Sequence, residues 1–463
     1  MATQKFPLAS MTVGVMLFGV LSCSNNTPSE ASTASSVASS TDAQSRATTD
    51  AAMTNTNTAT ATDSNSDNST KANAQTSSAQ DTAQKPAFTT KAIATFDEPW
   101  AMTALPTDTD PAPRLLVTEK SGNLFVVDTA TGVKHRVAGV PKVAYGGQGG
   151  LGDVTLAPDF ATTNAIYLSY VEKDANDDKY GAVVIKTTLS DLDTTSPKLT
   201  KIRRIWQQVP KISGQGHYSH RLLFSPDGQY LYISSGERQK KTPAQDMNAN
   251  LGKIVRLNPD GSIPADNPFV KAASNAQANA DSANKNKSTT PQSISAQIWT
   301  LGHRNVLGMQ FDDAGRLWAH EMGPRGGDEF NLIEKGNNYG WPVVSNGRNY
   351  SGIDIPDHST RPDFTAPQTS WTPVISPASM SFYQAGAQKD FPAWQNNMLI
   401  SGLSSKSLVV VSIPTDENAR DAQAKERYRY DMGERIRSVL SVDGMVWVLE
   451  DGSDGRLLRL LPE

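Results

Sequence analysis

The chain contains a single cysteine, Cys23, among its 463 residues. One thiol cannot form a disulfide within the chain or a cysteine-based zinc site, so neither can stabilise the fold. The formal net charge is only −4 at pH 7, and nothing in this charge balance indicates a nucleic-acid partner. The apolar run from Met11 to Leu21 is shorter than the roughly 20 residues that a transmembrane helix needs. This length disfavours a transmembrane helix.

The first residues predict how the chain is exported. Lys5 precedes the apolar run, and Val20-Leu21-Ser22-Cys23 resembles the lipobox of a bacterial lipoprotein, although Leu21 is bulkier than the usual residue. We therefore predict a lipoprotein signal peptide over residues 1–22 and a lipid anchor at Cys23, with the protein facing the periplasm. Ser24 is compatible with sorting to the outer membrane. A secretory signal cleaved without lipidation, which predicts a secreted protein, is the alternative.

Two segments lack the composition of a folded core. Residues 23–87 consist almost wholly of Ser, Thr, Ala, Asn, Asp and Gln up to Lys85, and this part contains no aromatic residue. Such a segment cannot bury enough apolar surface to offset its conformational entropy, so we predict a disordered tether. A segment of similar composition at about 270–296 predicts a disordered insertion between two strands.

The remaining residues, 88–463, repeat one pattern: an apolar pair, a turn near Asp-Gly, then alternating apolar residues. Each copy is typical of a two-stranded hairpin, and long amphipathic helices are scarce. Many short strands over this length favour an all-β fold, a six-bladed β-propeller, although five to seven blades also fit. The apolar pattern from Arg456 to Leu461 is expected to pair with Lys91–Phe96 and close the ring. The copies are Leu115–Asp128, Leu222–Ser234, Met309–His320 and Val439–Asp451.

The stretch from Leu301 to Pro342 is the densest in special residues. Hard oxygen donors in its acids, with backbone carbonyls at the Gly323-Pro324 turn, suit Ca²⁺ better than a transition metal. The guanidinium group of Arg304 can bind a carboxylate through two hydrogen bonds, and the side chain of Asn305 adds a donor and an acceptor. The alternative is a glycine-rich loop whose acids face water and whose arginine closes a surface salt bridge. The acids are Glu321, Asp328 and Glu329.

Among the six histidines, His217 is the candidate general base. It follows glycines and precedes a strand, which predicts a position at the mouth of a blade, where a neutral imidazole can accept a proton near pH 7. A structural role is the alternative. His220 and His303 raise a second possibility, a two-histidine metal site. We expect His320 to be buried and hydrogen-bonded, and His135 and His358 to lie on the surface.

Several motifs together resemble the glucose/sorbosone dehydrogenase family. They are GGQGGLGDVTLAPDF from Gly146 to Phe160, the GHY phrase at His217, KIVRLNPDGSIPADNPF from Lys253 to Phe269, GHRN with Gly308, EMGPRGGDEFNLI and NYGWP. The likeness runs from about Phe88 to Leu461, in the family's order. It implies a six-bladed propeller that uses pyrroloquinoline quinone (PQQ) and Ca²⁺ and resembles the aldose sugar dehydrogenase branch.

The resemblance also implies roles for single residues. His217 matches the base that takes the proton from the sugar hydroxyl while hydride passes from that carbon to the quinone. The cofactor-binding positions are Gln148, which also faces substrate, Arg304, Asn305, the arginine pair Arg435 and Arg437, and the acid Asp451. The carbonyls of Gly323 and Pro324 match ligands of the Ca²⁺ that polarises the quinone, and Glu329 and Tyr339 match a second, structural Ca²⁺ site.

The chain departs from the family pattern at three places. Leu307 stands where the family has glutamine, Ser404 where it has a cofactor-binding lysine, and Ser219-His220 where it has two glycines. Lys406 reaching back, or His220, is a candidate replacement for the missing charge.

The resulting hypothesis is an aldose sugar dehydrogenase that forms the lactone and passes electrons to an external acceptor. The main alternative is a non-catalytic Ca²⁺-binding propeller that serves as a carbohydrate-binding or scaffold protein. A Ca²⁺-dependent lactone hydrolase is a further alternative. It is disfavoured because it would need acids clustered around one metal ion, whereas residues 88–463 offer an arginine-rich pocket.

Overall fold

The computed structural model describes residues 85–106, 112–272, 294–386, 388–415 and 423–463. The predicted signal peptide, the predicted lipid anchor at Cys23, nearly all of the predicted tether and most of the predicted insertion lie outside these residues. Among the described residues, no helix is both long and apolar enough to cross a membrane.

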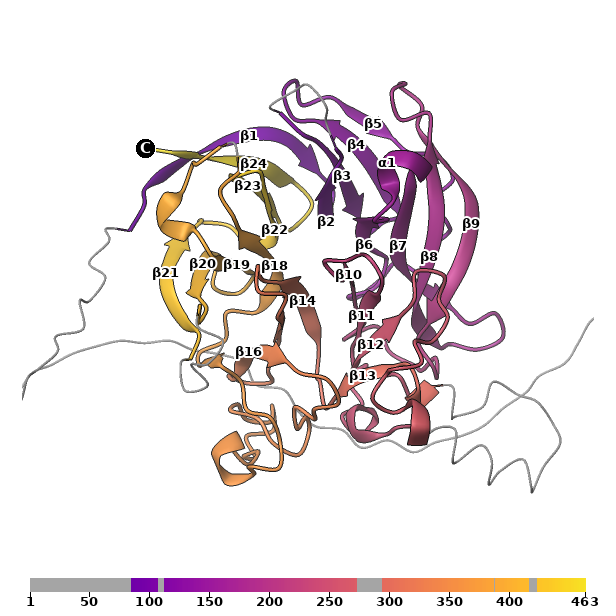
Figure 1. Ribbon diagram of the computed structural model, residues 1–463, viewed down its shortest axis with the longest axis vertical. Coiled ribbons are helices and arrows are strands. Elements are labelled where there is room, and N and C mark those ends of the chain that lie inside the picture. Colours follow the sequence, from indigo (N-terminus) through magenta and orange to yellow (C-terminus); the bar gives the residue numbers. More distant parts are fainter. Residues whose placement is uncertain (1–84, 107–111, 273–293, 387, 416–422) are drawn as a thin grey trace, which may run out of the picture. The chain divides into compact units, whose positions relative to one another are not determined.

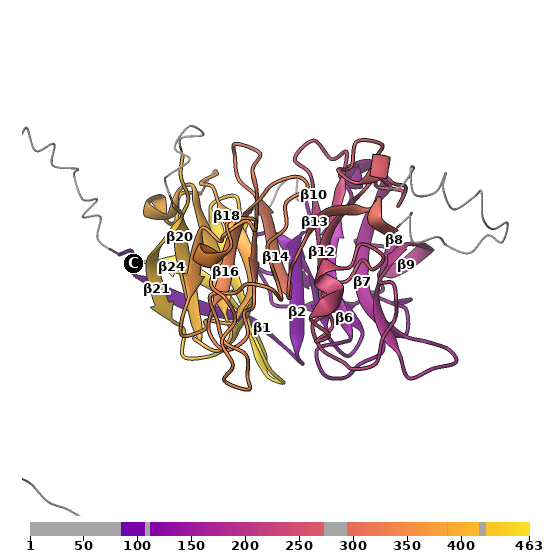
Figure 2. The same ribbon diagram turned by 90° about the horizontal axis from the view of Figure 1, so that it is seen from below.

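Within the described ranges, the strands form six four-stranded antiparallel sheets around a central axis (Figure 1). The innermost strands contact one another in a closed ring, in the order β2, β6, β10, β14, β18, β22 and back to β2. This arrangement is a six-bladed β-propeller, so the predicted fold class is confirmed. Figure 2 shows the ring from its side.

Each sheet contains four strands that follow one another from the central axis outward. The first three sheets are β2 (Pro99–Ala104), β3 (Arg114–Glu119), β4 (Asn123–Asp128), β5 (Lys134–Arg136); β6 (Leu151–Leu156), β7 (Ala165–Lys173), β8 (Tyr180–Ser190), β9 (Lys198–Gln207); and β10 (Ser219–Phe224), β11 (Leu231–Ser235), β12 (Lys253–Leu257), β13 (Ile298–Leu301). The last three are β14 (Val306–Phe311), β15 (Leu317–Glu321), β16 (Asp328–Ile333), β17 (Thr369–Trp371); β18 (Pro377–Tyr383), β19 (Asn397–Gly402), β20 (Ser407–Ser412), β21 (Lys425–Asp431); and β22 (Ile436–Val442), β23 (Met445–Glu450), β24 (Gly455–Pro462), β1 (Phe88–Phe96). Helical turns are short: α1 (Phe160–Thr163), η1 (Thr242–Gln245), η2 (His358–Thr360) and η3 (Pro392–Trp394).

The repeated sequence pattern does form hairpins. Its four copies are the pairs β3–β4, β10–β11, β14–β15 and β22–β23, each antiparallel. Gly228, Gly315 and Gly444 sit in the turns of the last three pairs with φ angles of 70°, 76° and 80°. Glycine adopts this left-handed backbone without a Cβ clash, which explains why the pattern carries it there.

The two ends of the described chain meet in one sheet. β1 pairs with β24 from Phe88↔Pro462 to Phe96↔Gly455, so the first strand supplies the outer edge of the last blade (Figure 1). The predicted closure of the ring is confirmed. Phe88 also packs against the preceding blade, with ring centroids 6.0 Å from Phe391 and 4.9 Å from Tyr430.

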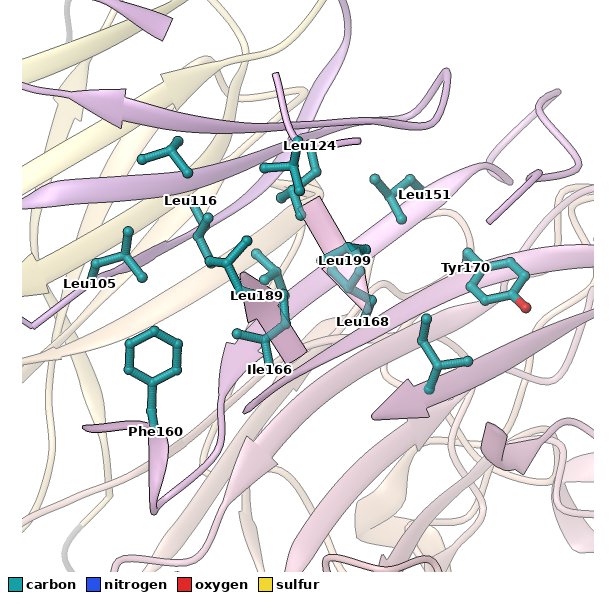
Figure 3. Close-up of a cluster of buried hydrophobic side chains, with 14 of the residues drawn as sticks. Leu105, Leu116, Leu124, Leu151, Phe160, Ile166, Leu168, Tyr170, Leu189 and Leu199 are labelled. Atoms are coloured by element: carbon teal, nitrogen blue, oxygen red, sulfur yellow. The ribbon is translucent and has the colours of Figure 1, made fainter. Parts of the chain in front are cut away.

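The core lies between neighbouring sheets rather than within a single layer. Leucines of β3 and β4 interdigitate with Ile166 and Leu168 of β7, and all are fully buried (Figure 3). Burying a leucine or isoleucine contributes roughly 1.5–3 kcal/mol relative to leaving it exposed, so these contacts hold adjacent blades together. The loops at the ends of the blades are then free to carry chemistry.

One end of the ring gathers two sets of connections. These are the loops from each outermost strand to the next innermost strand, and the loops from each second strand to the third. Because the sheets are antiparallel, both sets emerge at the same end. The residues that the sequence singled out as candidates lie mostly in these loops.

Candidate functional site

Two adjoining cavities, of about 270 and 920 Å³, open at this end of the ring. Gln148, Met322 and Ser376 line both of them. The smaller cavity is also lined by Trp100, Lys120, Gly147, Tyr218, Ser219, His220, Leu307, Leu403, Arg435 and Arg437. The larger one contains, among others, His217, Arg304, Gly323, Pro324, Asp328 and Tyr350. The structure therefore brings together candidates that lie far apart in the sequence.

His217 lies in the loop before β10 and lines the larger cavity. Its backbone N–H donates to Gln148 Oε1 at 2.7 Å, and its Nδ1 lies 2.5 Å from Glu237 Oε1. Burial lowers the pKa of His217 below its usual value, and Arg304 adds to this, although Glu237 acts in the opposite direction. The imidazole is therefore neutral near pH 7, as a proton acceptor must be.

Glu237 fixes which nitrogen of the imidazole is available. Burial acts to raise the pKa of Glu237, but the hydrogen bond from His217, the backbone N–H of Lys241 and the charge of Arg304 act in the opposite direction, and the pKa is lowered. The carboxylate is thus ionised and accepts from Nδ1–H, which leaves Nε2 as the proton acceptor. Sequence reasoning missed Glu237. Its signal is the Gly-Glu pair directly after β11, at the same end of a blade as the loop of His217.

The backbone around His217 adopts unusual conformations. His217, Ser219 and His220 have φ angles of 48°, 57° and 54°, in the left-handed region that side chains with a Cβ seldom enter. Such strain persists only where surrounding contacts hold it, and it concentrates at functional sites. In this loop Ser219 Oγ donates to Asn305 Oδ1 at 3.0 Å, which ties the loop to the next blade.

Arg304 and Asn305 lie in the loop before β14. The backbone N–H of Arg304 donates to Glu321 at 2.6 Å, and its Nη1 donates to the Met322 carbonyl at 2.9 Å. The Nε of Arg304 is buried and has no partner among the described residues. Because an unpaired buried donor costs free energy, this group is suited to an anion that the protein itself does not supply.

Arg435, Arg437 and Asp451 form one cluster beside the smaller cavity. Asp451 lies 2.8 Å from Arg435 Nε and 2.7 Å from Arg437 Nη2, and both arginines line the cavity wall. Burial acts to raise the pKa of Asp451, but the two guanidinium groups outweigh it and lower the pKa. Asp451 therefore stays charged and orients the arginines.

The Gly323-Pro324 turn is held by Asp328. The Asp328 carboxylate accepts from the backbone N–H groups of Gly323, Ile375 and Ser376, at 2.8, 2.8 and 2.7 Å. A Cβ on Gly323 would lie 2.3 Å from the Gly327 carbonyl oxygen, so only glycine fits at this position. Burial raises the pKa of Asp328 to about 6.

No group of three or more His, Cys, Asp or Glu side chains in the described part of the chain is arranged to hold a metal ion. A cation at the Gly323-Pro324 turn would therefore depend on backbone carbonyl oxygens.

Glu329 and Tyr339 lie apart from the residues that line the two cavities. Glu329 is buried, with its carboxylate 3.3 Å from His358 Nε2 and 3.2 Å from Asn331 Nδ2. Asn331 Oδ1 is buried without a partner in the described structure, and an oxygen of this kind suits a hard cation. The Tyr339 hydroxyl already donates to the Leu332 carbonyl at 2.6 Å, so it is used within the fold.

Several expectations need correction. His358 is buried and not on the surface, because it pairs with Glu329. His320 is buried as expected, but neither ring nitrogen has a partner among the described residues, so the expected hydrogen bond is wrong. The reading of Leu301–Pro342 as a loop with solvent-facing acids is also wrong, because its acids and Arg304 are buried. These acids are Glu321, Asp328 and Glu329.

The residues that depart from the family pattern have defined places. His220 stacks on Trp100, with ring centroids 5.0 Å apart, and its Nδ1 lies 2.7 Å from Ser169 Oγ. Burial lowers the pKa of His220 to about 3, so this ring is uncharged. Leu307 packs against Trp100 in a small apolar cluster that lines the smaller cavity. Its side chain therefore contributes apolar surface where a glutamine would offer a hydrogen bond.

Ser404 stands where the family has a lysine, and neither residue suggested to replace that positive charge can do so. His220 is neutral, and the ammonium of Lys406 donates to the Gly433 carbonyl at 2.9 Å, outside the residues that line both cavities. The two-histidine metal site also finds no support, because His303 is held by Thr300 and Glu321 at 2.9 and 2.8 Å.

The fold is a six-bladed propeller, and its candidate site holds a histidine paired with a carboxylate beside two cavities that are lined by arginines. These features together are those expected of a propeller enzyme that binds an anionic cofactor. The model of the glucose/sorbosone dehydrogenase family matches residues 96–459. The chain belongs to this family of sugar dehydrogenases, as its sequence motifs indicated.

Relatives of known structure and name agree with this assignment. Aldose sugar dehydrogenase YliI of Escherichia coli is 38% identical over 373 residues, which cover 79% of this chain and 91% of that protein. The crystal structure of the soluble aldose sugar dehydrogenase of E. coli in its apo form has a TM-score of 0.68 and 36% identity, covering 81% of this chain and 100% of that one. The PQQ-bound aldose sugar dehydrogenase of Streptomyces coelicolor has a TM-score of 0.61 and 26% identity, covering 82% of this chain and 100% of that one.

Proposed function

We propose that this chain is a PQQ- and Ca²⁺-dependent aldose sugar dehydrogenase that oxidises the anomeric hydroxyl to the lactone, with electrons passing on to an external acceptor. The observation that carries the proposal is the His217–Glu237 pair in the wall of a cavity that also contains the unpartnered Nε of Arg304. Membership of the family and the PQQ-bound relative support it.

The residues present fit an anionic quinone. PQQ carries several carboxylates, and these need cations and donors around them. Arg435 and Arg437 line the smaller cavity, and Arg304 borders the adjoining one with a donor that has no protein partner among the described residues. Gln148 lies between the two cavities and would contact either cofactor or sugar.

The residues also fit calcium at two places. The carbonyl groups of Gly323 and Pro324, in a turn held by the Asp328 carboxylate, offer oxygen ligands at the larger cavity. Glu329, with the unpartnered Asn331 Oδ1 beside it, offers a second, buried place away from the chemistry. When bound, PQQ supplies a two-electron acceptor and Ca²⁺ supplies a Lewis acid that makes this acceptor more electrophilic.

The chain's own residues perform the proton chemistry. His217 Nε2 accepts the proton of the anomeric hydroxyl as the C=O bond of the lactone forms, and the hydride that leaves the same carbon would pass to the bound two-electron acceptor. Glu237 holds Nδ1 and stabilises the imidazolium that results. Trp100 and Leu307 give the smaller cavity an apolar side, which disfavours water near the reacting groups.

We further propose that the protein is exported and anchored through lipidated Cys23, so that the head works on the periplasmic side of the outer membrane. This proposal rests on the lipobox-like sequence before Cys23. Mass spectrometry of the mature N-terminus in membrane fractions tests it, and an unmodified N-terminus beyond Cys23 would contradict it.

The enzymatic proposal is tested by titrating the purified full chain with PQQ and Ca²⁺ and following the quinone absorbance before and after adding glucose. We expect binding and sugar-dependent reduction of the quinone. A chain that binds no quinone at micromolar concentration would reject the proposal and favour a non-catalytic propeller, and glycan ligands would then be sought.

A further inference from the structure

Lys120 lies on the wall of the smaller cavity, in the turn between β3 and β4. Its side chain is only 14% exposed, and its ammonium lies 2.8 Å from Glu98 Oε1. Neither residue entered the site through a sequence motif. The same wall carries Arg435 and Arg437, so three cations from two blades line one cavity.

Each of these cations is paired with a carboxylate. Asp451 holds both arginines, and Glu98 holds Lys120 while also accepting a hydrogen bond from the Tyr145 hydroxyl. The wall therefore has one more cation than carboxylates. Because two carboxylates pair with three cations, the wall of the cavity keeps an excess of positive charge. A surface that binds an anion needs such an excess.

The position of the ammonium is defined by more than one contact. The Lys120 backbone N–H donates to the Glu98 carbonyl at 3.1 Å, and the Lys120 carbonyl accepts from Leu151 N–H at 3.0 Å. The ammonium also lies 5.5 Å from the centre of the Tyr145 ring. Because both backbone and side chain are fixed, little side-chain entropy remains to be lost when an anion binds.

We propose that Lys120 is a further cofactor-binding residue of this enzyme, and that its ammonium pairs with a carboxylate of the anionic quinone beside Arg435 and Arg437. This inference rests on the proposed function. Lys120 supplies the excess positive charge of the wall. Its partner Glu98 neutralises it only in part, because Glu98 also accepts a hydrogen bond from the Tyr145 hydroxyl.

The test is the equilibrium dissociation constant of PQQ for the full chain in Ca²⁺, measured by quenching of tryptophan fluorescence, for which Trp100 in the cavity wall is a reporter. We expect K120M to weaken binding about ten- to a hundred-fold, as loss of a charge-assisted hydrogen bond does. K120R should recover most of the affinity. Lys406 provides the matched control, because it is exposed and lines neither cavity, and K406M should bind within about twofold of the unchanged chain.

The variant E98Q separates binding from a merely structural role. If Lys120 binds the quinone, E98Q removes a competing negative charge but keeps an amide oxygen that accepts from the ammonium, so PQQ should bind as tightly as before or more tightly. If Lys120 only supports Glu98, E98Q and K120M should weaken binding equally, and that result overturns the inference. Unchanged affinity in K120M also overturns it. An unchanged chain that binds no PQQ would reject the proposed function itself, which is a different outcome.

Discussion

Three buried histidine–glutamate pairs occur among the described residues, and in only one of them does the histidine line a cavity. The Nδ1 of His217 lies 2.5 Å from Glu237, that of His303 lies 2.8 Å from Glu321, and the Nε2 of His358 lies 3.3 Å from Glu329. Neither His303 nor His358 lines either cavity. The chemistry of the residues is shared, so position relative to the cavities assigns the base.

Replacing His217 with glutamine should lower turnover by about two to four orders of magnitude, because general-base catalysis contributes that much. PQQ binding should be largely retained, because His217 acts on the sugar and not on the cofactor carboxylates. The measurement is kcat with glucose beside the PQQ dissociation constant. His135, partly exposed on β5, gives a control variant, and H135Q should leave both values unchanged. Unchanged turnover in H217Q would remove the residue from its role.

The Glu237→Gln variant tests the pairing through pH. The base is active when neutral, and burial lowers its pKa, so activity should persist below pH 6.5 in the unchanged enzyme. Glu237 acts to raise that pKa, so its removal should move the acid limb of kcat/KM to still lower pH. Turnover should fall at the same time, because Nδ1 loses the acceptor that orients the ring. An acid limb that moved to higher pH would contradict this account.

At the residue scale, sequence reasoning found side chains that stand in motifs and missed those that depend on the fold. His217 follows Gly214 and Gly216 and could be chosen from sequence. Glu237 and Lys120 were missed, because the first is 20 residues away on another loop and the second lies in an ordinary hairpin turn of a different blade. His358 was placed wrongly because its polar, turn-rich surroundings fold back over the acids of β16.

At the scale of single elements, the hairpins were predictable because period-two alternation and a turn glycine together specify them. Strand β12 was harder to predict, because all five of its residues are buried and the first of them is a lysine. The ammonium of Lys253 donates to the carbonyls of Pro243, Ala244 and Leu251 at 2.7, 3.0 and 2.8 Å. These bonds use every donor that a lysine has. The Lys253 side chain thus ties strand β12 to the loop that precedes it.

Substituting methionine for Lys253 should therefore destabilise the protein by about 1–3 kcal/mol, because it removes three buried hydrogen bonds, although the carbonyls of Pro243 and Ala244 keep a backbone donor. We expect a lower Tm in calorimetry and a lower denaturation midpoint in urea with an unchanged slope. Lys198 on β9 supplies the control, because its side chain is 54% exposed. K198M should alter the free energy of unfolding by less than about 0.5 kcal/mol. Equal effects of the two substitutions would show that the three carbonyls do not need the ammonium.

At the scale of the whole ring, the sequence predicted a six-bladed propeller, but its length alone did not exclude five or seven blades. A length of about 375 residues fits five to seven blades of four short strands, and the hairpin pattern marks only some of them. The ambiguity ends when strands are counted in the structure, where the six innermost strands contact one another in sequence order and β22 returns to β2. Closure was predictable because an apolar strand stands near each end of the folded region.

Closure also removes an unpaired sheet edge. β24 is covered by β1 along its length, from Phe88↔Pro462 to Phe96↔Gly455, and without β1 its backbone groups would face solvent. Exposed strand edges promote association with other chains. Phe88 adds packing between the last two blades through Phe391, Trp394 and Tyr430.

A chain that begins at Pro99, and so lacks β1, should therefore have a lower Tm than one that begins at Lys85, and it should form dimers or larger species. Calorimetry and light scattering after size-exclusion chromatography measure the two effects. The variant F88A in the longer chain separates packing from pairing: it should lower the Tm while the protein stays monomeric, because the strand still covers β24. If the shorter chain is monomeric with an unchanged Tm, then β1 is dispensable, and the contacts between the six innermost strands are enough to close the ring.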